Sequence, residues 1–340
     1  MKDCSKDILK YHGEKVTLSQ TIQSNLRDNR NANRDRIKRG LTKLEKPQPD
    51  DFIIQGSYAM KTMKQHPKND YDIDDGASFA AAKLQNKDGS SLSPFEARTL
   101  VKDALVAGGG LGDTPKVNKN CVTISYAAGH HVDIPVYRIL TDIFNRTTLE
   151  FASGDEWKDS NPTEITDWFR KTERNTLKEG EVEPQLRRLT RLMKIYSASN
   201  LGTDSLSGLL LTVLTAEIHL IYDSREDNAF RSLLRGIMTR LTYNRVIVNP
   251  ANCAEILTKD KDSARCDLLI SRIKESLKTL DVLDDPKCSQ IEARAAWDRV
   301  FKTDFFSKLQ MDEQAARSPT TPSDGYPDKR VNIQGPGTAA

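Results

Sequence analysis

Cysteine is scarce and scattered in this chain of 340 residues. The five cysteines are odd in number, and none belongs to the CxxC pairs that are typical of structural zinc sites. The five histidines supply no zinc-ligand spacing with them either. We therefore expect reduced thiols and no structural zinc ion.

Long apolar runs and an excess of one charge are also missing. No stretch approaches the roughly 20 apolar residues that span a bilayer, and the polar start MKDCSKDILKYHGEK lacks the apolar core of a signal peptide. The 51 Lys and Arg residues against 48 Asp and Glu residues leave a formal net charge of +3, too small to mark the whole protein as a polybasic ligand of nucleic acids or membranes. We expect a cytoplasmic protein with a local anion site, and with neither a membrane nor a nucleic acid as its partner.

The hydrophobic pattern changes character near residue 160. Strand-like alternation before this point predicts a sheet domain over residues 1–160, which includes a long N-terminal helix. Apolar residues then recur every three or four positions, which predicts a helical domain over residues 161–311. Residues 312–340 contain four prolines, three glycines and few large apolar groups, which predicts a flexible tail.

Local signals predict the elements of the first domain. A polar helix should run from about residue 15 to 46, because Pro47 ends it. Ser93 and Glu96 form a capping-box pattern that predicts a helix over residues 94–107. The predicted strands are residues 52–57, 71–75, 122–126 and 132–136, the last two forming a β-hairpin.

Three aspartates form the clearest chemical pattern. Asp72 and Asp74 are two residues apart on a predicted strand, so both carboxylates point to one face while Ile73 points into the core. Asp133 lies between two apolar residues of another predicted strand, and we expect all three carboxylates to converge. Like charges this close raise each other's pKa, and hard divalent cations that prefer oxygen ligands remove the conflict. We predict two Mg²⁺ ions on Asp72, Asp74 and Asp133, supporting in-line displacement at a triphosphate.

A phosphate-binding turn is predicted upstream of the first two aspartates. Gln55, Gly56 and Ser57 follow an apolar strand, and backbone N–H groups together with the Ser57 hydroxyl are suited to hold phosphate oxygens. The alternative is an ordinary helix cap at Gly56 and Ser57.

The combined motifs resemble a known enzyme superfamily, the DNA polymerase β-like nucleotidyltransferases. The motifs are GSYAMKT (56–62), DID (72–74) and VDIPV (132–136). The longer stretch FIIQGSYAMKTMKQHPKNDYDIDDG more closely resembles the bacterial cGAS/DncV-like enzymes, which make cyclic nucleotide signals in anti-phage defence, and the resemblance covers most of the chain. It implies an α/β (α+β) fold, in which a long helix precedes a polymerase β-like sheet domain and a helical domain follows it. Residues 1–160 would then be the catalytic core, and residues 161–311 would close the nucleotide cleft. It also implies that ATP, GTP or other nucleoside triphosphates are joined into a cyclic di- or trinucleotide with release of pyrophosphate.

The resemblance also assigns residues outside the sheet. In the family, a lysine and a nearby serine of the helical domain contact the donor triphosphate, and Lys194 and Ser207 match them here. From the residues alone, Lys194 belongs either to a basic surface shared with neighbouring arginines or to a solvated helix face, and Ser205 or Ser207 is equally suited to cap a helix. Asp75 fits the family's DDG variant, but we expect it to bind no metal because its side chain alternates to the opposite face.

Two other functions remain open from the sequence. Residues 27–46 carry eight basic and three acidic residues, which suits either a solvated helix or an enzyme that adds nucleotides to RNA 3′ ends. A catalytically silent nucleotide-binding module is the other alternative, and the three aspartates argue against it. Among aromatic residues, Tyr58 is suited to base stacking or to packing, whereas the helical stripe of Trp297, Phe301, Phe305 and Phe306 is predicted to be core.

The chain ends in three small residues, Thr338, Ala339 and Ala340. Some operons of the resembled family encode ubiquitin-transfer-like enzymes that attach the C-terminal carboxylate of the nucleotidyltransferase to another molecule. The resemblance therefore implies conjugation of this tail, and the alternative is a terminus that merely frays.

Overall fold

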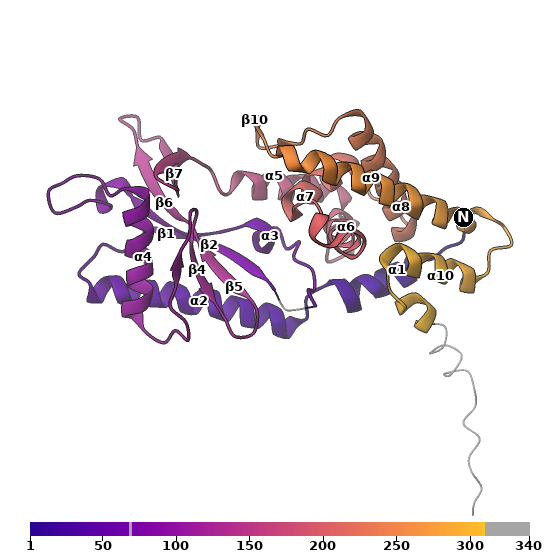
Figure 1. The fold of residues 1–340 in the computed structure, drawn as a ribbon, viewed down its shortest axis with the longest axis horizontal. Helices are drawn as coiled ribbons and strands as arrows, with labels where there is room; N and C mark the ends of the chain where they lie inside the picture. The colour runs from indigo at the N-terminus through magenta and orange to yellow at the C-terminus, as the bar shows by residue number, and fades with distance from the viewer. Residues whose placement is uncertain (68–69, 310–340) are drawn as a thin grey trace, which may run out of the picture.

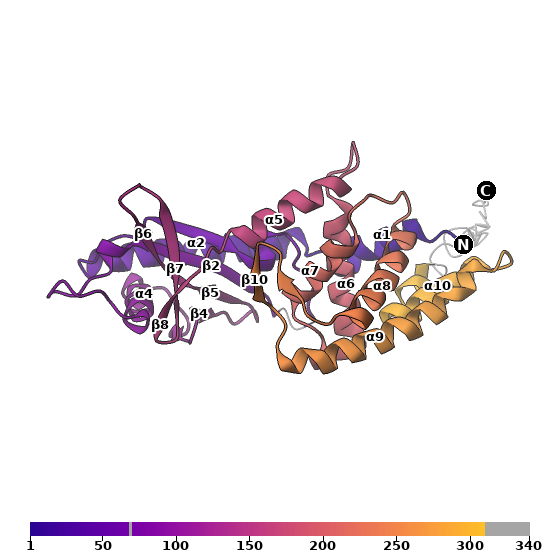
Figure 2. The ribbon, with the colours of Figure 1, turned by 90° about the horizontal axis from the view of Figure 1, so that it is seen from above.

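The computed structural model describes residues 1–67 and 70–309. They form an elongated molecule, with a β-sheet and its covering helices at one end and a bundle of helices at the other (Figures 1 and 2). The predicted tail, residues 312–340, lies outside the described residues. The described helices include none whose length and apolarity together would let it span a bilayer.

Strand β2 (Asp72–Ala80) organises the mixed sheet. Strand β1 (Asp51–Gln55) pairs antiparallel along one edge of β2, while β5 (His131–Ile134) and β6 (Val136–Thr141) pair parallel with successive halves of its other edge. The sheet order is β3-β4-β5-β2-β6-β7-β8, with the outer strands β3 (Lys116–Val117), β4 (Val122–Ser125), β7 (Thr147–Ser153) and β8 (Glu156–Asp159). The α/β fold class predicted from the sequence is confirmed.

The predicted hairpin is present, but it is shorter than expected. Strands β4 and β5 pair antiparallel, with Val122 opposite Ile134. Pro135 has no N–H to donate, and the chain continues beyond it as β6 against the second half of β2. The predicted extension of the hairpin to Val136 was therefore wrong.

Helices α2 (Gln20–Lys43) and α4 (Pro94–Gly108) pack closely together over one face of the sheet (Figure 1). The capping box predicted at Ser93 and Glu96 is present. A Cβ atom on Gly40 would lie 1.8 Å from the Ala104 carbonyl oxygen, and one on Gly108 would lie 2.2 Å from the Arg36 carbonyl oxygen. Glycine at both positions therefore allows this close approach of the two backbones.

The basic residues of α2 have structural partners. Arg36 donates to the carbonyl oxygens of Gly109 and Gly110, Arg39 to that of Gly108, and Lys43 to that of Ala107. Cations at a helix C-terminus satisfy free carbonyl groups and complement the helix dipole. Arg36, Arg39 and Lys43 therefore hold the end of α4, which weakens the interpretation of this helix as an RNA-binding surface.

Asp75 points toward α2, as its alternation predicted, and forms a two-pronged ion pair with Arg34. The Arg34 Nε and Nη2 atoms lie 2.7 and 2.5 Å from the two carboxylate oxygens. The side chain of Asp75 is only 2% exposed, whereas that of Arg34 is 24% exposed. This aspartate therefore ties the sheet to α2 and is not available to the opposite face.

We expect Asp75→Ala to lower the free energy of unfolding by about 3 kcal/mol, because it leaves a half-buried guanidinium without its carboxylate. Urea unfolding measures the loss. The matched control is Asp267→Ala, since Asp267 also lies 2.5 Å from an arginine, Arg245, but in an exposed pair. That control should cost less than about 1 kcal/mol, and equal losses in the two variants would contradict this role of Asp75.

The helical part has its own core. Its helices are α5 (Glu164–Glu173), α6 (Gln185–Leu201), α7 (Gly208–Ile218), α8 (Glu226–Tyr243), α9 (Asp260–Leu280) and α10 (Gln290–Phe301). The aromatic stripe of Trp297, Phe301, Phe305 and Phe306 is buried in this core, which confirms the prediction that it packs inside the protein. A short exposed hairpin of β9 (Val248–Asn249) and β10 (Asn252–Ile256) interrupts the predicted run of helices.

The N-terminal segment differs from the prediction of one long helix starting near residue 15. Ser19 caps α2, while α1 (Ser5–Tyr11) and a π-helical turn (His12–Val16) precede it. Ile8 and Tyr11 are buried in the core of the helical part. The first helix of the predicted catalytic core, residues 1–160, therefore packs against the helical bundle. The boundaries of that core stay a prediction.

Candidate active site

The three predicted aspartates converge at the start of β2. The parallel register of β2 and β5 places Asp74 directly opposite Asp133. Ile73 and Val132 are fully buried on the core side, so the carboxylates leave the sheet on the other face. Asp72, Asp74 and Asp133 together line a cavity of about 520 Å³, called here the catalytic cleft.

The carboxylates are in electrostatic conflict. Burial raises the pKa of Asp74 to about 7, and the charges of Asp133 and Asp72 add to the effect. The pKa of Asp72 is raised too, first by burial and then by Asp133 and Asp70. Thr123, across the β4–β5 ladder, donates to Asp133 at 2.5 Å. The three carboxyl groups cannot all be ionised without repelling one another. A hard divalent cation, which prefers oxygen ligands, would offset this repulsion and keep all three ionised.

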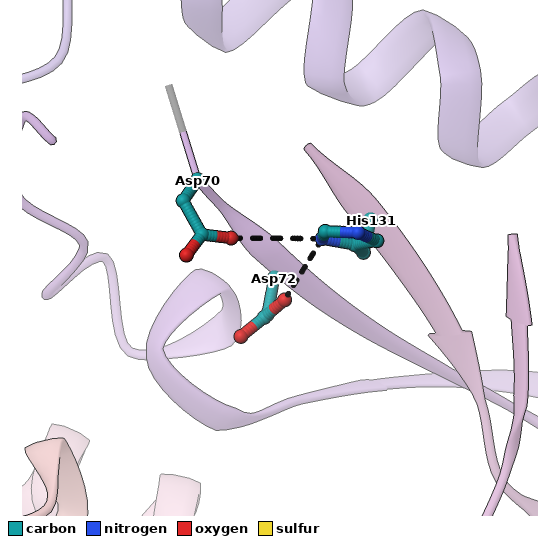
Figure 3. A group of neighbouring side chains, drawn as sticks. All are labelled: Asp70, Asp72 and His131. Atoms are coloured by element: carbon teal, nitrogen blue, oxygen red, sulfur yellow. Dashed lines mark ion pairs between the residues drawn. The ribbon is translucent and has the colours of Figure 1, made fainter. Parts of the chain in front are cut away.

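Asp70 and His131 extend this group of ligands. His131 Nδ1 lies 3.6 Å from an Asp70 carboxylate oxygen and 3.8 Å from an Asp72 oxygen (Figure 3). Asp70, Asp72 and His131 each offer a ligand atom, and these atoms lie within 4.8 Å of one another. Sequence analysis missed this arrangement because it depends on His131 pairing with Asp72 in the β2–β5 register.

Gly56 forms the turn that brings the backbone to the aspartates. Strand β1 ends at Gln55, one residue before the predicted glycine, and the short helix α3 (Gly56–Ala59) follows. Gly56 has a φ of +66°, and a Cβ atom there would lie 2.3 Å from the Asp74 Oδ2 atom. Only glycine meets both conditions. Gly56 and Ser57 line the catalytic cleft.

Gln55 does not line the catalytic cleft. Its side-chain oxygen accepts a hydrogen bond of 2.9 Å from the Tyr137 hydroxyl. Tyr137 also contacts the position of Gly76, where a Cβ atom would lie 2.6 Å from its ring. The Gln55 side chain therefore supports the end of β1 through Tyr137 and does not face the catalytic cleft.

Lys194 enters the catalytic cleft from α6, although the residue is only 6% exposed. Its Nζ atom donates to the Thr62 hydroxyl at 2.9 Å and to the Thr62 carbonyl oxygen at 3.2 Å. Burial lowers the pKa of Lys194 to about 7, and the charges of Lys64 and Arg191 contribute. The alternative of a solvated lysine is therefore wrong. A buried ammonium with a lowered pKa gains most from an incoming anion.

The predicted basic surface around Lys194 is also wrong. The arginines of α6 are paired with buried or half-buried glutamates: Arg187 with Glu173, Arg188 with Glu226 and Glu181, and Arg191 with Glu183. These ion pairs hold α6 in place. Among the arginines and the lysine of this helix, Lys194 is the one that faces the catalytic cleft.

Ser207 caps helix α7. Its hydroxyl accepts a hydrogen bond of 3.3 Å from the Leu210 N–H, while Ser205 bonds to Ser197 instead. The residue after it, Gly208, lines the catalytic cleft, with a Cβ position 3.5 Å from the Lys194 side chain. The structure thus shows the capping role that the sequence left open for Ser207.

Comparison with known proteins gives matches consistent with this geometry. Residues 50–137, which contain β1, the Gly56 turn and all three aspartates, match the family model described as the nucleotidyltransferase domain of cyclic GMP-AMP synthase DncV-like proteins. The fold resembles Escherichia coli DncV in its 3′-deoxy GTP bound form, with a TM-score of 0.63, 17% identity, and coverage of 87% of this chain and 94% of that one. It also resembles Vibrio cholerae DncV cyclic AMP-GMP synthase, with a TM-score of 0.62, 17% identity, and coverage of 84% and 92%. The same Vibrio cholerae enzyme in complex with the linear intermediate 5′ pppA(3′,5′)pG matches with a TM-score of 0.62 at 18% identity, covering 84% and 92%.

Proposed function

We propose that this chain is a nucleotidyltransferase of the polymerase β-like superfamily that makes a cyclic di- or trinucleotide. The match of residues 50–137 to the DncV-like nucleotidyltransferase domain supports this proposal. The product would be a second messenger in anti-phage signalling, formed from nucleoside triphosphates with release of pyrophosphate. The observation that carries the proposal is the convergence of Asp72, Asp74 and Asp133 beside the Gly56 turn, in a cavity that Lys194 also lines.

In this proposal Asp72, Asp74 and Asp133 would hold two Mg²⁺ ions. When bound, such ions activate the attacking ribose hydroxyl and stabilise the leaving pyrophosphate. The protein's own contribution is to fix the three carboxylates. The β2–β5 register sets their spacing, and the Thr123 hydroxyl orients Asp133.

The phosphates would be held from two sides of the catalytic cleft. Gly56 and Ser57 offer backbone N–H groups and a hydroxyl at the end of β1, and Lys194 offers its ammonium from α6. We assign Gln55 and Ser207 to the same phosphate-binding region, where Gln55 supports the turn through Tyr137 and Ser207 fixes the start of α7 beside Gly208. By their descriptions, the three structures named above contain guanine or adenine nucleotides or belong to an enzyme that makes cyclic AMP-GMP, which supports ATP, GTP or related triphosphates as substrates.

The test is incubation of the purified protein with each nucleoside triphosphate and Mg²⁺, without nucleic acid, followed by phosphatase treatment and mass spectrometry. The proposal predicts a phosphatase-resistant product with the mass of a cyclic di- or trinucleotide. A product that forms only when an RNA 3′ end is added would replace it with the RNA-tailing alternative. No transfer of any nucleotide under either condition would support a silent nucleotide-binding module.

Lys194→Ala should raise KM for the triphosphate about tenfold or more with a smaller effect on kcat, because the ammonium supplies mainly ground-state binding. In the unmodified protein KM should also rise with pH above about 7, since the free enzyme then holds Lys194 neutral and must take up a proton to bind the anion. Steady-state kinetics between pH 6 and 9 give both values.

The control for this prediction is Lys171→Ala, which removes an exposed lysine of α5. It should keep the KM of the unmodified protein and its dependence on pH. In Lys194→Ala the rise of KM above pH 7 should disappear. If the rise persists in that variant, a different group binds the phosphates.

Conjugation of the C-terminus stays a prediction, because residues 312–340 lie outside the described part of the chain. Co-expression with a ubiquitin-transfer-like enzyme should give higher-mass conjugates of the unmodified protein. Ala340→Glu should abolish these conjugates, because conjugation needs small C-terminal residues that can enter the active-site channel of the transfer enzyme.

A further inference from the structure

Two hydrogen bonds in series connect the edge of the sheet with Asp133. The turn between β3 and β4 begins at Asn118, whose backbone N–H donates to the Cys121 carbonyl oxygen at 2.8 Å. The Asn118 side-chain Nδ2 atom donates to the Thr123 hydroxyl at 2.7 Å. Thr123 lies opposite Asp133 in the β4–β5 ladder, and its hydroxyl donates to the Asp133 Oδ1 atom at 2.5 Å. These three side chains are called here the hydrogen-bond chain.

The chemistry of the two end groups fixes the direction of the hydrogen-bond chain. An amide NH₂ group donates and an ionised carboxylate accepts, so the Thr123 hydroxyl accepts from Asn118 and gives its single hydrogen to Asp133. The Cys121 sulfur also lies 3.5 Å from this hydroxyl, but a thiol is a weak donor and a weak acceptor. A hydrogen bond to a charged acceptor is stronger, and Asp133 therefore receives the Thr123 hydrogen.

This direction decides which oxygen of Asp133 is available to a metal ion. The Oδ1 atom accepts from Thr123, whereas the Oδ2 atom has no hydrogen bond to any other described residue. Asp133 lines the catalytic cleft and lies opposite Asp74 in the β2–β5 register. Mg²⁺ demands near-ideal octahedral geometry, so the orientation of each carboxylate affects how tightly it binds. Side chains that orient a metal ligand typically change metal affinity by about 10- to 100-fold.

We propose that Asn118 and Thr123 are positioning residues that raise the metal affinity of the catalytic cleft. By directing the Thr123 hydrogen to Oδ1, they hold the Asp133 carboxylate with Oδ2 free for the metal. Neither Asn118 nor Thr123 is among the described residues that line the catalytic cleft, so both act through Asp133. This inference rests on the proposed function, because it needs Asp133 to be a metal ligand.

The alternative is that the hydrogen-bond chain only stabilises the β3–β4 turn. The turn also has a backbone hydrogen bond from Asn118 to Cys121, and β4 pairs with β5 from Val122 to Ser125. Substitutions at the side chains of Asn118 and Thr123 leave these backbone contacts available. Variants that change the direction of a hydrogen bond, but not the shape of the side chain, therefore separate positioning from turn stabilisation.

The first test measures Mn²⁺ binding to the nucleotide-free protein at pH 8, from the electron paramagnetic resonance signal of free Mn²⁺. Thr123→Val keeps the shape of the side chain and removes the hydroxyl, so the dissociation constant should rise about tenfold or more. Thr123→Ser restores the donor and should stay within about threefold of the unmodified protein. The matched control is Thr147→Val, at an exposed position of β7, which should bind Mn²⁺ like the unmodified protein.

Asn118 gives a sharper comparison, because two substitutions there predict different results. Asn118→Ala removes the donor but leaves Thr123 able to donate to Asp133, so the dissociation constant should rise no more than about threefold. Asn118→Asp keeps the shape and places a second acceptor beside the Thr123 hydroxyl, which has one hydrogen for two carboxylates. Mn²⁺ binding should then weaken about fivefold or more. The added negative charge by itself would strengthen the binding of a cation, so charge does not explain this result.

The second test measures how turnover depends on the Mg²⁺ concentration. Thr123→Val should need about tenfold or more Mg²⁺ for half-maximal turnover, while kcat at saturating Mg²⁺ stays within about threefold of the unmodified value. A loss of kcat that saturating Mg²⁺ does not restore would contradict a role in metal affinity. Absence of turnover in the unmodified protein would reject the proposed reaction, and the Mn²⁺ measurements would still decide the role of Asn118 and Thr123.

Three results of the Mn²⁺ measurements would overturn the proposal. The first is equal affinity in Thr123→Val and the unmodified protein, or equal losses in Thr123→Val and Thr123→Ser. The second is binding by Asn118→Asp that is as tight as, or tighter than, binding by Asn118→Ala. The third is no Mn²⁺ binding by the unmodified protein, which would refute the metal site and this inference together. Asn118 is exposed, so its two variants keep the test decisive if Thr123→Val fails to fold.

Discussion

Asp74→Asn is expected to lower nucleotide turnover by about 1,000-fold or more without unfolding the protein, because it removes the charge of a metal ligand and preserves its shape. Asp74 lies opposite Asp133 and beside the Gly56 turn, so both proposed metal ions depend on it. Pyrophosphate release under saturating Mg²⁺ measures turnover. Asp72→Asn should behave in the same way.

The stability of this variant gives an independent check. In the metal-free protein the pKa of Asp74 is raised from 3.8 to about 7, so the folded state binds this proton more tightly than the unfolded state does. This group therefore lowers the stability of the unmodified protein as pH rises from about 4 to 7. At pH 8 in EDTA, thermal unfolding should occur at the same or a higher temperature in Asp74→Asn than in the unmodified protein. A variant that keeps more than about a tenth of normal turnover would refute the assignment of Asp74 as a metal ligand.

Gly56→Ala is expected to reduce turnover about 100-fold or more, because its methyl group would occupy the position of an Asp74 carboxylate oxygen. The Cβ atom would lie 2.3 Å from Asp74 Oδ2, so either the turn or the carboxylate must shift. Misplacement of a reacting group by about 1 Å costs roughly this factor. Pyrophosphate release again measures the effect, and circular dichroism confirms that the fold is retained.

The control separates the clash from the backbone strain. Gly89 also has a positive φ, of +84°, but a Cβ atom there would meet nothing within 4 Å. Gly89→Ala therefore carries the same kind of conformational cost, of about 1 kcal/mol, without touching the catalytic cleft. It should lose stability but keep its turnover. If Gly56→Ala were as active as Gly89→Ala, the contact between Gly56 and Asp74 would have no catalytic importance.

Much of the fold could be predicted from local patterns. Alternation placed Asp72 and Asp74 on one face of β2 and Asp75 on the other, and the ion pair of Asp75 with Arg34 agrees with that assignment. The capping box at Ser93 could also be predicted from the sequence, because its two hydrogen bonds join residues three positions apart. These features depend on neighbours in sequence, and so they need no tertiary information.

Features that depend on long-range contacts could not be predicted. Lys194 was expected either on a basic surface or on a solvated helix face, yet tertiary packing buries it against Thr62 and pairs the surrounding arginines with glutamates. Strand register decides that His131 lies beside Asp72, and alternation alone does not give register between strands. The β9–β10 hairpin was missed because its residues are almost all polar or exposed and show no strong period.

We propose that Asp72, Asp74 and Asp133 hold the metal ions of a nucleotidyltransferase. The most direct test is a crystal structure of the protein with Mn²⁺ and a non-hydrolysable nucleoside triphosphate, in which anomalous scattering locates the metal. We expect anomalous peaks coordinated by these three aspartates and by the triphosphate, with the phosphates between the Gly56 turn and Lys194. Peaks confined to Asp70, Asp72 and His131, or a triphosphate bound elsewhere, would contradict it.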